Sequence, residues 1–220
     1  MKSKKLKLVE NFKKFNNKSN YIFSALNLAF LAYLALGHIK PTKRYFLWCD
    51  GLIGQIYSGI KKTPGSKFIR FFFKYKFTEI VILGNHSNIQ IKFLKKKFKT
   101  KIRSIVLPKI TRKNIKKYAP KVKKNSLILI TLPTPKQEML SDEIIKKNKY
   151  YKILCIGGGL SIATGEVKNC PNYISRIGLE FIWRLRTDTF RRISRLLFTL
   201  VMFIFYLING KLKKFTIFKI

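Results

Sequence analysis

Short apolar runs alternate with polar stretches along the chain, and the clearest apolar run covers residues 127–130. Its length, with turn-forming residues on both sides, is typical of a strand buried on both faces. Pro133 and Pro135 follow it and end the strand, because proline cannot donate a hydrogen bond to a neighbouring strand. The polar residues that come next, up to Lys147, are compatible with a helix.

The same order of apolar strand, polar turn and helix recurs along most of the chain. Residues 21–36 fit a strand–turn–helix unit or a buried helix that stops at Gly37, and residues 1–20 fit a strand or a frayed arm. Further strands are predicted at residues 44–49, 79–83, 102–107 and 150–156, and a helix at 88–97. This repetition predicts a Rossmann-like α/β fold, a mostly parallel sheet with helices on both faces.

The C-terminal part has a different pattern. Residues 177–186 and 191–195 are helical in pattern, and residues 196–208 form an uncharged apolar run between basic flanks. The run is short for a membrane span, yet too apolar to leave in water. It suits a segment in the interface of an anionic leaflet, where each nearby Lys or Arg contributes roughly 1 kcal/mol; a helical hairpin packed into the core is the alternative. We divide the chain into an α/β core, 1–175, and a basic, apolar helical appendage, 176–220.

Composition narrows the class of protein. The hydrophobic content of 47% excludes a disordered chain, although 47 Lys and Arg against 9 Asp and Glu give a net charge of +38. The electrostatic field of so large a positive charge attracts nucleic acid, anionic lipid or phosphate-bearing substrates. The lysines are scattered, so biased codon usage explains the charge equally well. Cys49, Cys155 and Cys170 are too few and too irregular for a disulfide frame or a zinc site, which favours a reduced, cytosolic environment. The N-terminus lacks a signal-peptide pattern.

Polar residues follow several predicted strands at the edge where open parallel sheets bind ligands. Asp50 ends an aromatic strand, so it is either a general base with a raised pKa or an ordinary turn residue before Gly51. Gln137 and Glu138 follow the 127–130 strand, where they suit the edge of a base or sugar, or simply begin a helix. These three side chains are the first candidates for a site.

Glycines mark two further strand ends. Gly84 allows close backbone approach to a ligand, and Ser87 can cap the next helix, whose N-terminus would favour a phosphate. A run of three glycines begins at Gly157, but the next glycine is Gly165, so the G-x-G-x-x-G fingerprint is not met. We therefore expect close backbone approach there, but no nicotinamide dinucleotide.

Three arginines in the C-terminal part are the candidates for binding a diphosphate. Arg184, Arg191 and Arg195 are spaced by seven and four residues, so one continuous helix would place them on one face. Guanidinium groups grip phosphates bidentately, although a solvated basic face is the alternative. His38 and His86 have no carboxylates nearby in the sequence, and no metal site is predicted.

Taken in order, these motifs resemble the WecG/TagA/CpsF family of bacterial glycosyltransferases (glycosyltransferase family 26), over roughly residues 20–196. Each motif alone is weak, and their common order makes the resemblance specific. The matching segments are Asp50-Gly51-Leu52-Ile53-Gly54, Thr63-Pro64-Gly65, Leu83-Gly84-Asn85, Thr134-Pro135-Lys136-Gln137-Glu138, Gly157-Gly158-Gly159 with Gly165 and Pro171, and Gly178-Leu179-Glu180-Phe181-Ile182-Trp183-Arg184-Leu185. The T-P-x-Q-E segment is the most specific.

The resemblance implies a UDP-sugar-dependent hexosyltransferase of surface polysaccharide biosynthesis. It would transfer N-acetylmannosamine or another hexose to a polyprenyl-diphosphate-linked sugar, with inversion at the anomeric carbon and without a metal or another cofactor. The protein would be peripheral or monotopic on the cytoplasmic face of the bacterial inner membrane, with its appendage on the anionic membrane surface. A homo-oligomer is left open, and no specific nucleic acid is expected.

The resemblance also implies roles for individual residues. Asp50 would be the general base, and Asn27 and Gln137 would bind donor or acceptor. Arg184, Arg191 and Arg195 would stabilise the departing diphosphate, which needs preorganised donors, whether a metal or guanidinium groups. The chain has no acidic cluster such as D-x-D. The other substrate-binding positions implied by the motifs are Lys62, Gly84, Thr134, Glu138, Gly157, Gly158 and Gly159.

Some positions depart from the family pattern. Ala25 stands where the family usually has Thr, and Lys62 stands where it has Arg, so the bidentate fork is lost. Asn169-Cys170-Pro171 and Asp188-Thr189 replace Arg-Ala-Pro and Glu-Pro. Because of these changes, the sequence does not determine the identity of the donor sugar. An inactive family member that acts as an assembly partner stays an alternative. A basic nucleic-acid-binding protein is the runner-up from another class, although no recognition signature is present.

Overall fold

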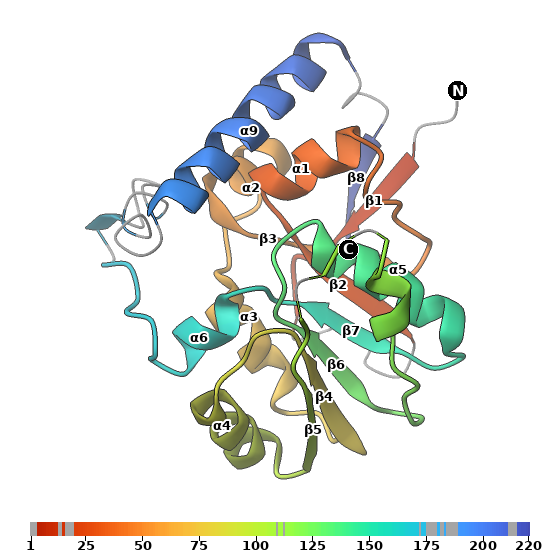
Figure 1. Cartoon of the computed structure of the whole chain (residues 1–220). Coiled ribbons are helices and arrows are strands. Elements are labelled where there is room, and N and C mark those ends of the chain that lie inside the picture. Colours follow the sequence, from red (N-terminus) through yellow and green to blue (C-terminus); the bar gives the residue numbers. More distant parts are fainter. Residues whose placement is uncertain are drawn as a thin grey trace.

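A single eight-stranded sheet organises the protein (Figure 1), in the order β5-β4-β6-β7-β2-β3-β1-β8, and all of its strand pairs are parallel. This confirms the Rossmann-like α/β fold. The computed structural model describes residues 4–12, 15, 20–108, 110–111, 113–171, 173–174, 180, 183, 189–210 and 215–220.

The strands follow the apolar runs of the sequence. They are β1 (Lys4–Leu8), β2 (Tyr21–Leu26), β3 (Tyr45–Cys49), β4 (Glu79–Leu83), β5 (Lys101–Ile105), β6 (Leu127–Ile130), β7 (Lys152–Cys155) and β8 (Phe215–Lys219). Every residue of β2, β4, β6 and β7 is buried. Burial on both faces is why these strands read as continuous apolar runs rather than as alternating ones.

The helices occupy the connections between strands. They are α1 (Leu28–Ala35), α2 (Gly51–Ser58), α3 (Gly65–Phe68), α4 (Asn88–Phe98), α5 (Lys136–Lys147), α6 (Gly159–Ala163) and α9 (Thr189–Ile208), with 3-10 turns η1 (Ile69–Phe72) and η2 (Ile115–Tyr118). Residues 21–36 are therefore a strand–turn–helix unit. As expected, Ser87 caps α4, its hydroxyl accepting a 3.2 Å hydrogen bond from the Gln90 amide.

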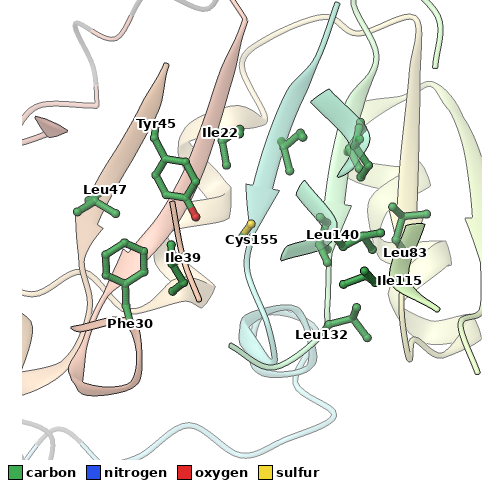
Figure 2. Packing of buried hydrophobic residues seen from close by; sticks show 14 of the residues in the cluster. Ile22, Phe30, Ile39, Tyr45, Leu47, Leu83, Ile115, Leu132, Leu140 and Cys155 are labelled. Carbon is green, nitrogen blue, oxygen red and sulfur yellow. The ribbon is translucent and has the colours of Figure 1, made fainter. Parts of the chain in front are cut away.

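Two hydrophobic cores lie on opposite faces of the sheet. On one face Ile22 and Leu47 pack with Phe30 of α1 and Leu140 of α5 (Figure 2). On the other face lies an aromatic core, in which Trp48 stacks on Phe68 with 3.9 Å between ring centroids. Side chains alternate along a strand, so neighbouring apolar residues supply both cores.

Helix α9 lies along α1 (Figure 1), and Tyr33 of α1 contacts Phe198 of α9 at 6.0 Å between ring centroids. Thr199 and Tyr206 are buried, whereas a long apolar face of α9 is exposed, including Leu197, Val201 and Ile204. Residues 196–208 are thus one helix with an exposed apolar face, not a hairpin inside the core. In the described part of the chain, no helix combines the length and apolar character needed to cross a membrane.

The last strand, β8, was not predicted. It runs parallel to β1, from the pair Lys4 and Phe215 to the pair Leu8 and Lys219. The predicted appendage, residues 176–220, was expected to be helical, but its last residues belong to the main sheet. A five-residue strand at a sheet edge gives little local signal, and its partner lies at the other end of the chain.

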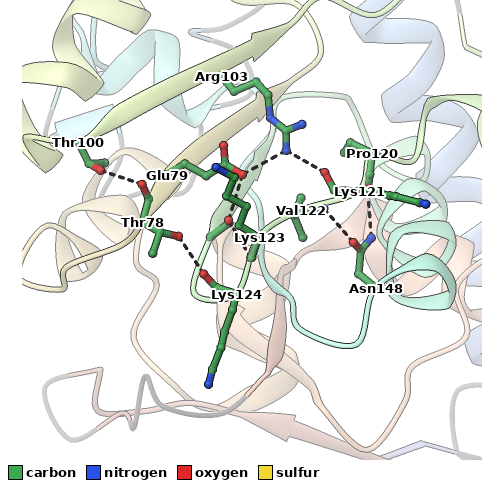
Figure 3. A network of polar contacts seen from close by, with 11 residues as sticks. Thr78, Glu79, Thr100, Arg103, Pro120, Lys121, Val122, Lys123, Lys124 and Asn148 are labelled. Atoms are coloured by element: carbon green, nitrogen blue, oxygen red, sulfur yellow. Dashed lines mark hydrogen bonds and ion pairs between the residues drawn. The ribbon is translucent and has the colours of Figure 1, made fainter.

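A polar network holds the edge of the sheet where β4 and β5 begin (Figure 3). Arg103 donates to the Glu79 carboxylate at 3.2 Å and to the Lys121 carbonyl at 2.9 Å, and Ser126 donates to Glu79 at 3.1 Å. Asn148 holds the backbone of Pro120 and Val122. A cavity of about 390 Å³ beside this network contains none of the predicted site residues.

Candidate active site

Eight of the predicted site residues follow the C-terminal ends of four neighbouring strands, β6, β7, β2 and β3. Because these strands are parallel, the loops after them meet at one edge of the sheet, where α/β proteins bind ligands. With about 4.8 Å between strands, the ends of β6 and β3 lie roughly 14 Å apart. The residues on these loops are Thr134, Gln137 and Glu138 after β6, Gly157–Gly159 after β7, Asn27 after β2 and Asp50 after β3.

Glu138 is a fully buried carboxyl group at the centre of this edge. Its Oε1 accepts hydrogen bonds from Ser24 of β2 at 2.6 Å, from Gln137 at 2.8 Å and from Thr134 at 3.2 Å. Burial raises the pKa of Glu138, and the hydrogen bonds from Ser24 and Gln137 oppose that shift. Its Oε2 is enclosed without a partner among the described residues. The carboxyl group therefore binds protein groups and does not face the surface.

Gln137 joins two of the loops. Its Nε2 donates to Thr134 at 3.1 Å as well as to Glu138, and its Oε1 accepts from the Gly157 amide at 3.0 Å. Only 3% of the residue is exposed. The sequence pointed to Gln137 and Glu138 as side chains that could contact a base or sugar directly. In this structure both are buried, and they hold the loops after β6 and β7 together.

The glycines serve different purposes. Gly84 has a φ of +122°, and a Cβ there would lie 2.5 Å from the Thr131 hydroxyl, so its close approach is to protein. A Cβ at Gly159 would lie 3.0 Å from the Gly65 carbonyl carbon, which packs the start of α6 on the Pro-Gly turn. A Cβ at Gly158 would meet nothing within 4 Å. Gly158 is therefore where the glycine run faces open space.

Asp50 is half-buried between β3 and α2. Its amide donates to the Leu26 carbonyl at 3.1 Å, which ties the ends of β2 and β3 together, and its side chain makes no capping bond to α2. A Cβ at Gly54 would come within 2.0 Å of the Leu26 carbonyl oxygen, so α2 lies directly against the end of β2. This packing places Asp50 beside Asn27, whose side chain caps α1 by accepting from the Phe30 amide at 3.0 Å.

Lys62 lies close to Asp50 in the structure. The Thr63 amide donates to the Cys49 carbonyl at 2.8 Å, so the Pro-Gly turn stays against the end of β3. Burial raises the pKa of the Cys49 thiol, and both Asp50 and Lys62 act on it electrostatically. The Lys62 ammonium is 2.7 Å from the Glu180 carboxylate, which brings Glu180 to this turn.

Of the three predicted arginines, the structure places the side chain of Arg195. It donates to the Thr134 carbonyl at 3.2 Å, so α9 is attached to the loop after β6. Arg191 belongs to α9, but its side chain, like all of Arg184, lies outside the described residues.

Two polar residues at this edge were missed. Ser24 lies inside β2, where no site residue was expected, and its hydroxyl donates to the Glu138 carboxylate. Glu166 accepts hydrogen bonds from Ser87, from Gln90 at 2.7 Å and from Thr164 at 2.9 Å. A phosphate was expected at the N-terminus of α4, and the structure has the Glu166 carboxylate bound to the capping serine there. Two features of the sequence could have pointed to Glu166: it is one of only nine acidic residues, and it directly follows Gly165.

Within the described part of the chain, no three His, Cys, Asp or Glu side chains group closely enough to hold a metal ion. Residues 61–216 match the family described as "Glycosyl transferase WecG/TagA/CpsF family". The match covers well over half of the chain. It includes the Pro-Gly turn, the loop after β6, the glycine run and Arg195, while Asn27 and Asp50 precede it.

Proposed function

Because the chain belongs to the WecG/TagA/CpsF glycosyltransferase family, we propose that it transfers a hexose from a UDP-sugar to a polyprenyl-diphosphate-linked sugar. The family indicates a glycosyltransferase of cell-surface polysaccharide biosynthesis. The proposed donor carries N-acetylmannosamine or a related hexose. The convergence of Asp50, Lys62, the loop after β6 and the glycine run at one edge of the sheet carries the proposal.

In the proposed reaction Asp50 is the general base. Its carboxylate takes the proton of the acceptor hydroxyl while the hydroxyl oxygen attacks the anomeric carbon of the donor. The bond between that carbon and the diphosphate oxygen breaks, and its electron pair leaves with UDP. Attack opposite the leaving group inverts the anomeric centre. The half-buried position of Asp50 at the end of β3 suits this role, since it lies at the ligand-binding edge.

Cationic side chains would stabilise the departing UDP in place of a metal. Negative charge develops on the diphosphate, and preorganised donors lower the energy of that state. Arg195 lies against the loop after β6, and Arg191 precedes it by one turn of α9. Gly158 faces open space, so the glycine run can bring its backbone close to a phosphate. Lys62 supplies a further cation on the Asp50 side.

The exposed apolar face of α9 supports a membrane-bound acceptor. Leu197, Val201 and Ile204 are among the exposed side chains of this helix, and contiguous exposed patches of this kind mark interaction surfaces. Basic residues precede them in α9 and follow it in the sequence, at 211, 213 and 214. We propose peripheral or monotopic attachment to the anionic cytoplasmic face of the bacterial inner membrane.

UDP release tests the proposal. The full chain in detergent would be given a panel of UDP-sugars and a polyprenyl-diphosphate-sugar acceptor, with EDTA present. We expect turnover with one donor, at a rate that EDTA does not change. In Asp50→Asn the rate of UDP release should fall by at least about 100-fold. Glu143→Gln is the matched control, because it makes the same change at an α5 carboxylate paired with Lys146.

Two results would count against the proposal. Full activity in Asp50→Asn would remove Asp50 as the base. No turnover with any donor would favour the alternative of an inactive assembly partner, and Ala25 and Lys62 would then be the first positions to change towards the family pattern.

A further inference from the structure

Glu166 is an acid held by neutral groups in a chain rich in cations. Its carboxylate is bound by the hydroxyls of Ser87 and Thr164 and by the side-chain amide of Gln90. Buried Glu138 is also bound by neutral groups, but four other acids of the described chain pair with cations: Glu79 with Arg103, Glu143 with Lys146, Glu180 with Lys62 and Glu10 with Lys219. Although 47 of the 220 residues are Lys or Arg, none in the described part pairs with Glu166.

This arrangement keeps Glu166 available as a hydrogen-bond acceptor. Desolvation raises its pKa, but the hydrogen bonds from Ser87, Gln90 and Thr164 outweigh it, so the pKa lies below its usual value. A carboxylate offers about four acceptor positions, and three are used here. The residue is exposed, so a further donor can reach it.

Gln90 gives a second, independent indication that the cluster lacks a partner. Its Nε2 donates to Glu166 and, at 3.0 Å, to Ser161. Its Oε1 is buried without a donor among the described residues, and the whole residue is only 5% exposed. A buried acceptor without a donor costs free energy. A hydroxyl donor beside this amide would remove that cost after a small rotation of the side chain.

The cluster lies at the ligand-binding edge but far from Asp50. Ser87 follows β4, and Glu166 follows the glycine run and α6, whereas Asp50 follows β3. Four strand spacings separate β4 from β3 in the sheet order, or about 19 Å. A donor with its anomeric carbon near Asp50 would extend its nucleoside half towards Glu166.

We propose that Glu166 and Gln90 accept hydrogen bonds from a vicinal diol of the sugar nucleotide, and that this selects the substrate. This inference rests on the proposed glycosyltransferase function. The diol can belong to the ribose or to the transferred hexose, and the position of the cluster favours the ribose.

Calorimetric titration of the full chain in detergent tests the assignment. The ligands would be UDP, 2′-deoxy-UDP and 3′-deoxy-UDP, followed by the active UDP-hexose and its 3-deoxyhexose and 4-deoxyhexose analogues. We expect the wild type to bind UDP about ten-fold more tightly than the deoxy analogue that lacks the contacted hydroxyl. In Glu166→Ala this ratio should fall to near one. The matched control Glu143→Ala should keep the wild-type ratio.

The outcomes separate the inference from the function on which it rests. In one outcome, Glu166→Ala reduces the affinity ratio between the UDP-hexose and a deoxyhexose analogue while the ratios for the deoxynucleotides stay unchanged. That result would support the diol site and assign the diol to the hexose. Unchanged ratios in Glu166→Ala, and in Gln90→Leu as a second variant, would overturn the inference and leave the proposed function intact. A wild type that binds neither UDP nor any UDP-hexose would overturn both.

Discussion

The side-chain carbonyl of Gln137 accepts a 3.0 Å hydrogen bond from the backbone amide of Gly157. The loop after β6 and the glycine run after β7 are thereby joined through one buried amide. Thr134 extends the connection, since its hydroxyl binds Gln137 and its carbonyl accepts from Arg195 of α9. A change at Gln137 is therefore transmitted to three segments of the candidate site.

Replacing Gln137 with Leu should lower both stability and activity. The change removes three hydrogen bonds in a buried position and leaves the Gly157 amide without its side-chain acceptor. We expect about 1–3 kcal/mol of destabilisation in urea unfolding, and a higher KM for the UDP-sugar. Lys146→Ala, whose side chain is 63% exposed on the same helix, should change stability by less than about 1 kcal/mol. An unchanged KM would show that the Gln137 link does not shape the donor site.

Alanine at two adjacent glycines should have different effects on stability. Gly159→Ala would place a Cβ 3.0 Å from the Gly65 backbone, so α6 or the Pro-Gly turn must shift and Tm should fall. Gly158→Ala meets nothing within 4 Å at an ordinary φ of −76°, so Tm should stay close to the wild type. If the glycine run approaches a phosphate at Gly158, that variant should still weaken UDP binding. Calorimetric Tm and UDP titration on both variants would separate packing from ligand contact.

Asp142 should make stability depend on pH. Desolvation by burial raises its pKa from 3.8 to about 7, and nearby Lys146 opposes the shift. The folded state therefore binds a proton that the unfolded state releases above about pH 4, so this contribution to stability is present at low pH and is lost as pH rises towards 7. Asp142→Asn should flatten this slope and add up to about 4 kcal/mol above pH 7. Urea unfolding at pH 5 and pH 8 measures both effects; parallel wild-type and mutant curves would contradict the prediction.

Lys62 occupies a position where an arginine would give a bidentate fork. Lys62→Arg should keep the contact with Glu180 and lower the KM for the UDP-sugar about two- to ten-fold, if Lys62 binds the diphosphate. Lys62→Ala should raise the KM and leave Glu180 without this cation. Steady-state kinetics on both variants checks the prediction, and equal KM values across wild type, Arg and Ala would show that residue 62 does not contact the donor.

Charged residues on the exposed face of α9 should abolish membrane binding without unfolding the protein. Leu197→Asp and Ile204→Asp replace side chains that are 55% and 46% exposed, so Tm should change little. We expect both to lose co-sedimentation with vesicles that contain phosphatidylglycerol. Ile89→Asp is the matched control, because Ile89 is 56% exposed but lies on α4. Retained binding in the α9 variants would mean that lysine charge alone holds the protein to the vesicles.

The sequence predicted the α/β fold because its central strands are buried on both faces and its helices begin at recognisable caps such as Ser87. Two kinds of feature were not predictable. The pairing of β8 with β1 joins the two ends of the chain, and no local pattern specifies such a partner. The roles of Ser24, Gln137 and Glu138 depend on contacts between β2 and the loop after β6. Gly84 was expected to allow close approach of a ligand, and the group that comes close to it in the structure is Thr131.

The parallel pairing of β1 with β8 gives α9 a second attachment. The helix is held near its start by Arg195 and along its length by α1, and the chain beyond it returns to the main sheet. A helix fastened at both ends cannot swing away like a free tail. A bilayer that takes up its apolar face would therefore orient the whole sheet, and would hold the edge that carries Asp50 at a fixed height above the lipid headgroups.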